Sequence, residues 1–370
     1  LPSVQRQKTH RRVAETIERR AGGVDAASIR VSALNNESLR PRLFDLSTHY
    51  DAAGSKERAR YFGLLAAEQS VRQLALEVAE DHFRIANRYA DGGDEQCRYR
   101  IAIGYADVLI KTGKIEAALE QLDSAERIAL DKVGRAEIQA LRVSAALKKR
   151  PSRELPAVCA EAIRGLGVSI PRTTTGLIFG TIKEWLAHLL FPTPRKRRES
   201  KEFPIDREKQ LALRLLTRSL MFYRFQNSIG IVYTVQKIRN VAKGLPASTD
   251  TATADCVLAA GLYMHMFPRH KKAIKLLDRA MDYCSRHGKG MHEAHAGLTA
   301  GWCLAAAGHL SDSSHYLSIA RERFRDAGAA RDLATTEGWM AYTYAWQGDF
   351  AEAIRLSRNT YQTAIDQGWD

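Results

Sequence analysis

Small and large apolar residues recur along this chain in one fixed order. In the segment 115–126, an alanine, a leucine and a second alanine stand at positions 118, 122 and 125. Steps of four and then three residues bring such a set onto one face of a helix. The pattern therefore predicts helices that each present one narrow, closely packing face. The sets in this register are Ala79, Phe83 and Ala86; Ala118, Leu122 and Ala125; Ala273, Leu277 and Ala280; Ser313, Leu317 and Ala320; Ala353, Ser357 and Thr360.

The spacing between these sets is that of a repeat. The last three sets begin at positions 273, 313 and 353, so they lie 40 residues apart. The helix before a set carries small residues at complementary positions, as Ala300 and Gly301 do, and a glycine such as Gly113, Gly308 or Gly348 separates the two helices. Glycine adopts the left-handed conformation that ends a helix, and such helix pairs bury their apolar faces by stacking on one another. We therefore expect an all-α fold, namely a tetratricopeptide-like helical-repeat solenoid that forms a right-handed superhelix with one irregular insertion.

The period is interrupted once, in the middle of the chain. Residues 167–205 contain Pro171, a run of threonines, an apolar stretch and a basic run. The pattern leaves open whether this segment is a hinge or a packed cap. We expect an N-terminal helical segment at 1–40, N-terminal helical repeats at 41–166, an irregular amphipathic helix with a basic loop at 167–205, and C-terminal repeats of about 40 residues at 206–370.

The charge balance is strongly basic, with 56 Lys and Arg against 42 Asp and Glu and a net charge of +14. Such a balance suits an acidic partner such as nucleic acid or a membrane surface. Here the excess is spread along the chain, which favours solvated helix faces over a nucleic-acid partner. The one dense run, Arg195–Arg198, lies beside Pro192 and Pro194 and predicts an exposed loop.

Cysteine usage and hydropathy bear on the compartment. The five cysteines are scattered and form no CxxC pair, which favours free thiols in a reducing cytoplasm. The most apolar stretch, residues 176–191, contains Lys183, Glu184 and His188, so it is too short and too charged to span a bilayer. It predicts instead an amphipathic helix that is buried on one side.

Few residues are grouped as catalytic or metal chemistry requires. Cys284, His287, His292 and His295 fall close together beside Glu293, but a metal would need at least three converging ligands. Solvated histidines between two helices are the favoured interpretation, and no GxSxG element is present. We expect neither catalysis nor a metal or other cofactor in this chain.

The inner face of the repeats is the best candidate for binding. In a solenoid of this kind the first helix of each pair lines the concave surface. The inward positions hold aromatic side chains, a methionine, arginine, glutamine and histidine, a mixture that suits a peptide or small ligand. Packing between repeats is the competing interpretation of the aromatic residues. The expected surface consists of Arg218, Phe222, Phe225, Gln226, His265, Met266, His295, Trp302, Tyr342 and Trp346.

Two segments resemble a known family. Residues 43–86, with His49, Tyr50 and Gly54, and residues 160–198, with the element GLGVSIPR followed by an apolar helix, a proline and basic residues, are similar to the region after the nucleotidase module of large bacterial STAND-class signalling ATPases. The resemblance covers roughly residues 8–366. Relatives of this class are often fused to kinase, cyclase or DNA-binding regulator domains.

The resemblance implies a regulatory role. In that family the tetratricopeptide region is similar to a sensor arm, which receives a small inducer or a protein and releases an ATPase held inactive. This chain has no GxxxxGK[ST] loop, begins at Leu1, and opens with a helix whose Val13 and Ile17 share a face. We therefore interpret it as a fragment whose first helix is a remnant of a preceding NTPase module, which would also be its partner.

The expected function is thus a cytoplasmic, non-catalytic region that binds a protein, peptide or small-molecule inducer and regulates an attached NTPase or output domain. Two alternatives remain open. The first is a constitutive protein–protein scaffold. The second is a basic, nucleic-acid-associated helical repeat, which the net charge of +14 motivates.

Overall fold

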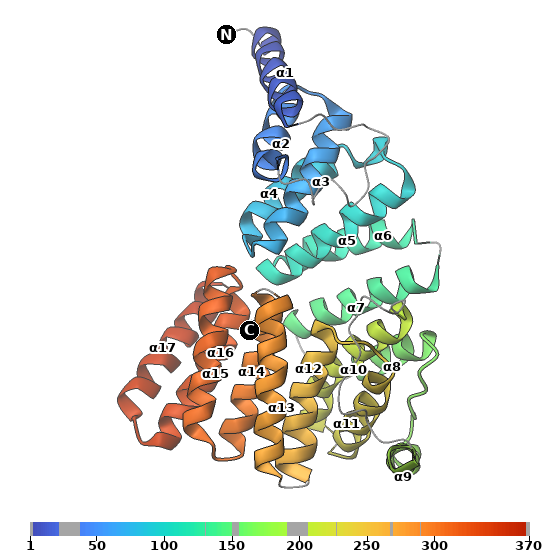
Figure 1. The fold of residues 1–370 in the computed structure, drawn as a ribbon, viewed down its shortest axis with the longest axis vertical. Coiled ribbons are helices and arrows are strands. Elements are labelled where there is room, and N and C mark those ends of the chain that lie inside the picture. The colour runs from blue at the N-terminus through green and yellow to red at the C-terminus, as the bar shows by residue number, and fades with distance from the viewer. Residues whose placement is uncertain are drawn as a thin grey trace. The chain divides into compact units, whose positions relative to one another are not determined.

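The computed structural model describes residues 3–21, 38–129, 131–149, 155–190, 206–226, 228–266, 269–288 and 290–367. Every element in these ranges is helical, which confirms the predicted all-α class (Figure 1). The elements are α1 (Ser3–Arg20), η3 (Arg40–Arg42), α2 (Leu43–Ala52), α3 (Lys56–Arg72), α4 (Leu76–Arg88), η4 (Ala90–Gly92), α5 (Glu95–Thr112), α6 (Ile115–Glu126), α7 (Lys132–Lys149), α8 (Leu155–Gly165), α9 (Thr174–Leu190), α10 (Arg207–Gln226), α11 (Ser228–Lys243), α12 (Thr249–Leu258), the π-helical η6 (Ala259–Met266), α13 (His270–Tyr283), the π-helical η7 (Cys284–Gly288), α14 (Met291–Ala306), α15 (Leu310–Asp326), α16 (Ala330–Gln347) and α17 (Phe350–Asp366).

The chain forms two compact units, residues 1–129 and residues 130–370, and each is described by itself. Within each unit most helices pack on their neighbours along the chain. None of the helices in the described ranges combines the length and the apolar character needed to cross a membrane.

In the N-terminal unit, α4 packs closely on α5 because one helix supplies a large side chain and the other a glycine. The ring of Phe83 lies so close to Gly104 that a Cβ there would be 2.5 Å from the Phe83 Cζ. Ala79 and Ala86, on either side of Phe83 in the predicted register, are fully buried. Phe83 thus packs on the helix that follows its own, whereas the sequence predicts that this set contacts the preceding helix. That contact is present as well, because a Cβ on Gly63 of α3 would lie 3.1 Å from the Ala86 backbone nitrogen.

The predicted turn glycines end their helices as expected. Gly113 follows α5 with a φ of +87°, and the amide of Lys114 donates to the Leu109 carbonyl at 2.8 Å. Gly348 follows α16 in the same conformation, with a φ of +86°. Any other residue type would be strained there, because a Cβ disfavours this left-handed backbone conformation.

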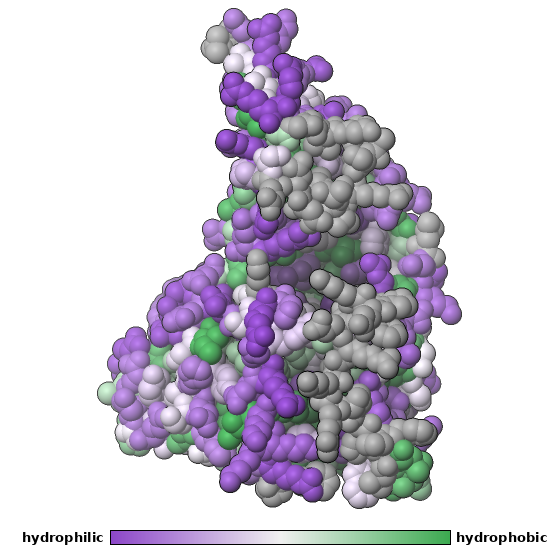
Figure 2. All heavy atoms as spheres, viewed as in Figure 1, coloured by the Kyte–Doolittle hydropathy of each residue, from purple (hydrophilic) through white to green (hydrophobic). Residues whose placement is uncertain are grey.

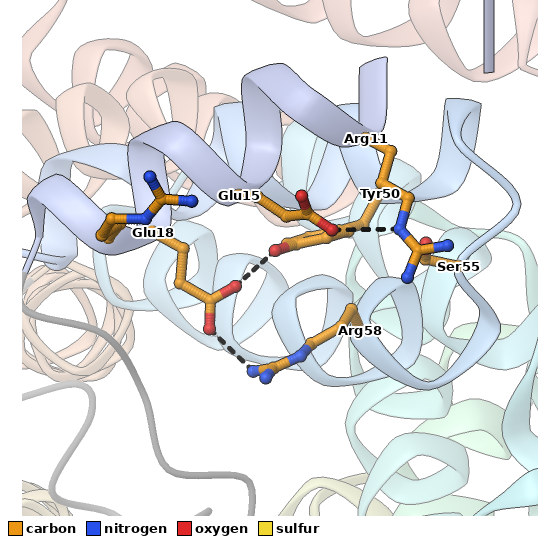
Figure 3. A pocket seen from close by; sticks show the side chains of 7 residues that line it. Arg11, Glu15, Glu18, Tyr50, Ser55 and Arg58 are labelled. Carbon is orange, nitrogen blue, oxygen red and sulfur yellow. Dashed lines mark hydrogen bonds and ion pairs between the residues drawn. The ribbon is translucent and has the colours of Figure 1, made fainter. Parts of the chain in front are cut away.

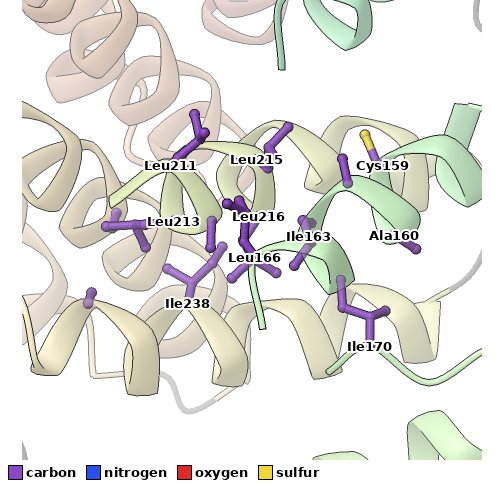
Figure 4. Close-up of a cluster of buried hydrophobic side chains, with 14 of the residues drawn as sticks. Cys159, Ala160, Ile163, Leu166, Ile170, Leu211, Leu213, Leu215, Leu216 and Ile238 are labelled. Carbon is purple, nitrogen blue, oxygen red and sulfur yellow. The ribbon is translucent and has the colours of Figure 1, made fainter. Parts of the chain in front are cut away.

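In the C-terminal unit a continuous core joins α7, α8, α10, α11 and α12. Figure 4 shows Leu213 and Leu216 of α10 facing Ile163 of α8 and Ile238 of α11. All four side chains are fully buried, so this cluster holds the middle helices of the unit together.

The described part of the irregular segment is packed. Ile170 and Leu177 are buried in the core that α10 and α11 form, and the Tyr233 hydroxyl donates to the Ser169 carbonyl at 2.8 Å. Residues 167–190 therefore pack on the unit as a cap. The basic run Arg195–Arg198 lies outside the described residues.

The last repeats keep the predicted register with one difference. Ser313, Leu317 and Ala320 of α15 are fully buried, whereas Ser357 of α17 is exposed and Thr360 is half-buried. The reason is that Ser357 and Thr360 line an open groove between α16 and α17. Position in the register predicts the helix face, but burial also requires an element on the opposite side.

Candidate partner-binding surface

A row of aromatic side chains crosses from α14 to α16. The ring centroids of Trp302 and Trp339 are 6.0 Å apart, those of Trp339 and Tyr342 5.6 Å, and those of Tyr342 and Trp346 6.2 Å. Positions 339, 342 and 346 share a face of α16 because they are separated by three and four residues. Tyr342 is 59% exposed and Trp346 52% exposed, so the row ends in aromatic surface that a partner can reach.

Tyr342 also lines a groove between α16 and α17. The groove has a volume of about 730 Å³. Small residues of α16, including Gly338, Ala341 and Ala345, line it together with the exposed side chains of Phe350, Ile354 and Tyr361. Its remaining lining residues are Ala353, Ser357, Arg358, Thr360 and Ala364. A contiguous apolar surface of this kind is a signature of binding sites.

The preceding helix pair shows how such a face is covered. The face that α14 and α15 present toward the next pair is packed by α16. The Arg321 Nε donates to the Glu337 Oε1 of α16 at 2.8 Å, and Trp302 is half-buried beside Trp339. Forty residues later, Tyr361 and Tyr342 occupy the equivalent positions and are exposed. Tyr361 and Tyr342 thus stand where Arg321 and Trp302 of the preceding pair contact α16.

One buried carboxylate links the two helices that line the groove to the helix before them. Glu337 of α16 is buried and accepts hydrogen bonds from Arg321 of α15 and, at 3.2 Å, from the Asn359 amide of α17. A carboxylate removed from water in this way is tolerated because its oxygens are paired. Glu337 consequently holds three successive helices at a defined spacing.

The predicted site residues do not form one surface in the structure. The side chains of Arg218, Phe222, Phe225, Gln226 and His265 lie outside the described residues. Met266 is partly buried and packs against the core of α10 and α11. His295 is exposed, with its ring edge-on to Phe324 at a centroid distance of 5.0 Å. Trp302, Tyr342 and Trp346 belong to the aromatic row.

Four large aromatic or aliphatic residues of this surface were not among the predicted set: Trp339, Phe350, Ile354 and Tyr361. A signal for three of them is present in the sequence. Phe350, Ile354 and Tyr361 are separated by four and seven residues and share one face of α17, while Ala353 and Leu356 make the buried face. A helix with two apolar faces contacts something on both sides.

The histidines near residue 290 do not gather round a metal. Cys284 is fully buried, whereas His287, His292 and His295 are exposed. His287 stacks on Tyr283 with a centroid distance of 4.4 Å. Within the described ranges, no three His, Cys, Asp or Glu side chains are grouped as metal ligands would be.

A second pocket, of about 370 Å³, lies in the N-terminal unit between α1, α2 and α3 (Figure 3). Four of its charged residues form two ion pairs. Glu18 accepts from Tyr50 and, at 2.7 Å, from Arg58, and Arg11 donates to Glu15 at 3.0 Å. Burial and the Glu18 contact raise the pKa of Tyr50, which keeps its hydroxyl protonated as a donor. The two contacts of Glu18 join α1 to the two helices after it.

No family model matches the chain, and no curated protein matches it.

Proposed function

We propose that this chain is a non-catalytic protein-interaction region whose C-terminal repeats form a tetratricopeptide-like solenoid and bind an amphipathic helix of a protein partner. The observation that carries the proposal is the exposed apolar groove between α16 and α17, continuous with the aromatic row through Tyr342. Its surface is of the kind that takes up an apolar helix face.

The apolar side chains supply the affinity. Phe350 is 65% exposed, and Ile354 and Tyr361 are also largely exposed. Complete burial of one such side chain contributes roughly 1.5–3 kcal/mol. Three of them together offset part of the loss of translational and rotational freedom that binding costs, so a partner helix should cover all three.

The chemistry of the groove also indicates the character of the partner helix. Its α16 wall consists of glycine and alanine, which allow close approach of another backbone. Arg358 is the only charged residue among the groove's described lining residues. A helix with bulky apolar residues on one face and an acidic residue at its edge complements this surface.

The wider role is regulatory. The resemblance of segments 43–86 and 160–198 to STAND-class signalling ATPases supports a sensor arm that controls an attached NTPase. Reading the coding sequence upstream of Leu1 tests this part. A nucleotide-binding module with a GxxxxGK[ST] loop is expected there. Its absence would leave a constitutive scaffold as the function.

A peptide of α16 itself, residues 330–347, is a suitable probe for the groove, because α16 covers the equivalent face of α14 and α15. We expect the labelled peptide to bind saturably in fluorescence anisotropy. Ile354→Glu should weaken binding by tenfold or more, because it replaces an apolar contact by a charged side chain that the apolar face of the peptide would have to desolvate. Val78→Glu, at an exposed position of α4, is the control and should bind as the wild type does.

Circular dichroism and thermal melting establish that both variants are folded. Equal binding by Ile354→Glu and the wild type would show that the peptide uses another surface. An absence of saturable binding would remove the proposal of a helix-binding groove.

A further inference from the structure

The helix α9 has its apolar side directed outward. At 100° per residue, six large apolar side chains fall within an arc of roughly 140°. All six are exposed, with Phe179 and Leu190 each at 73%. They are Ile178, Phe179, Ile182, Trp185, Leu186 and Leu190. This is the reverse of the usual arrangement, in which a surface helix buries its apolar stripe.

The opposite side of α9, which packs on α11, has Leu177 as its one large apolar residue with a described side chain and is otherwise small or polar where it is described. A Cβ on Gly180 would lie 2.9 Å from the Tyr233 ring, so only glycine allows this approach without a shift of the ring. Glu184 is buried, and its carboxylate accepts from the Lys237 ammonium at 2.6 Å and from the Asn240 amide at 2.7 Å.

These contacts determine the rotation of α9 about its own axis. Turning the helix to bury Ile182 would separate Glu184 from Lys237 and Asn240 and leave a carboxylate without its partners. The outward apolar side is therefore held in place by a buried ion pair. Figure 1 shows α9 at the margin of its unit, beside α11, and Figure 2 shows hydrophobic residues gathered at that place.

The charge around this apolar side is positive. Glu184 is the one acidic residue in α9 and α11, and Lys237 neutralises it. Lys183 is exposed and lies next to Leu190 at one edge of the arc, while Trp185 lies at the other edge. A convex helix with an apolar side, a tryptophan at one edge and a lysine at the other suits the boundary between lipid headgroups and acyl chains.

We propose that α9 binds an anionic lipid surface, with the helix axis in the plane of the interface and its apolar side inserted below the headgroups. A flat, negatively charged surface complements a convex ridge with a lysine at one edge, whereas a protein partner would have to supply a groove. The inference is independent of the groove between α16 and α17.

Vesicle co-sedimentation tests the proposal with phosphatidylcholine vesicles that contain or lack phosphatidylglycerol. The variant is Phe179→Ser/Ile182→Ser/Leu186→Ser. The matched control is Phe350→Ser/Ile354→Ser/Ile365→Ser, which removes three equally exposed apolar side chains from α17. We expect the wild type and the control to sediment with the phosphatidylglycerol vesicles. The α9 variant should bind these vesicles at least roughly tenfold more weakly.

A second measurement does not depend on the triple variant. Vesicles with brominated acyl chains should quench the fluorescence of the wild type more than that of Trp185→Phe, because Trp185 would enter the interface. Failure of the wild type to bind phosphatidylglycerol vesicles, or equal loss of binding in both triple variants, would overturn the proposal. A concentration-dependent dimer that only the α9 variant abolishes, without vesicle binding, would overturn it in favour of an interface between copies.

Discussion

Gly301 of α14 lies directly against Leu317 of α15, and a Cβ at position 301 would come within 2.4 Å of the Leu317 Cγ. The Gly301 carbonyl accepts a hydrogen bond from the Ser313 hydroxyl, at 2.8 Å. Leu317 and Ser313 are both fully buried, so neither can move aside at low cost.

Gly301→Ala should therefore destabilise the protein, although alanine is the better helix former. We expect a loss of roughly 1–3 kcal/mol from overpacking, measured as a lower midpoint in urea unfolding. Gly338 is the matched control, because a Cβ there meets no atom within 4 Å. Gly338→Ala should raise stability by about 0.5–1 kcal/mol. A stabilising effect of Gly301→Ala would mean that α14 and α15 are less closely packed than described.

Ala280 and Trp346 should respond in opposite ways to a change in size. Ala280 belongs to the small–large–small set of α13 and is only 3% exposed. Ala280→Trp should disrupt the packing of its helix pair, so that the C-terminal repeats no longer unfold in one cooperative transition. Trp346→Ala should change the melting temperature little, because Trp346 is half exposed, and should weaken binding of the α16 peptide. Unfolding of the Trp346→Ala variant would place this residue in the core.

His82 should make the stability depend on pH. Burial lowers the pKa of its imidazole, and a ring nitrogen lies 2.9 Å from the Ser47 hydroxyl. The folded-state pKa of His82 thus lies below the unfolded value of about 6.5. Below pH 6.5, roughly, the unfolded chain binds more protons than the folded one. The contribution of His82 to the free energy of unfolding is therefore fully present above the unfolded pKa and is lost as the pH falls toward the folded pKa.

Urea unfolding between pH 8 and pH 5, about the range spanned by histidine titration, measures this effect. His82→Gln should reduce the dependence on pH, because it removes the titrating group but keeps a hydrogen-bonding side chain. His287→Gln, at an exposed position, is the control and should show the same pH dependence of stability as the wild type. An unchanged slope in His82→Gln would assign the dependence to other groups.

The cysteines should divide into two classes of reactivity. Four of the five thiols are buried, whereas Cys97 is half-buried. Burial raises the pKa of the Cys284 thiol to about 12 and that of Cys256 well above its ordinary value. Burial raises the pKa of Cys97 too, so its partial exposure is what should let a thiol reagent such as Ellman's react with it in the native protein and with the others only after unfolding. Rapid reaction of several thiols under native conditions would contradict the burial of the other four cysteines.

Much of the local structure could be predicted because it depends on neighbours within a few residues. The faces of α4, α13 and α15 follow from the helical period, and the left-handed turns at Gly113 and Gly348 follow from the need for a residue without a Cβ. Tyr342 and Trp346 of the candidate surface could be found in the same way, since they stand at fixed positions of a repeat.

The tertiary structure alone decided which apolar faces are buried. The composition of α9 predicts a one-sided helix, but its rotation depends on Lys237 and Asn240, which are more than fifty residues away from Glu184. Likewise, Ser357 follows the same repeat register as Leu317, yet one is exposed and the other buried. Periodicity determines which side chains share a face, because that is a local property of the helix. Burial of that face depends on what packs against it, which is a property of the whole fold.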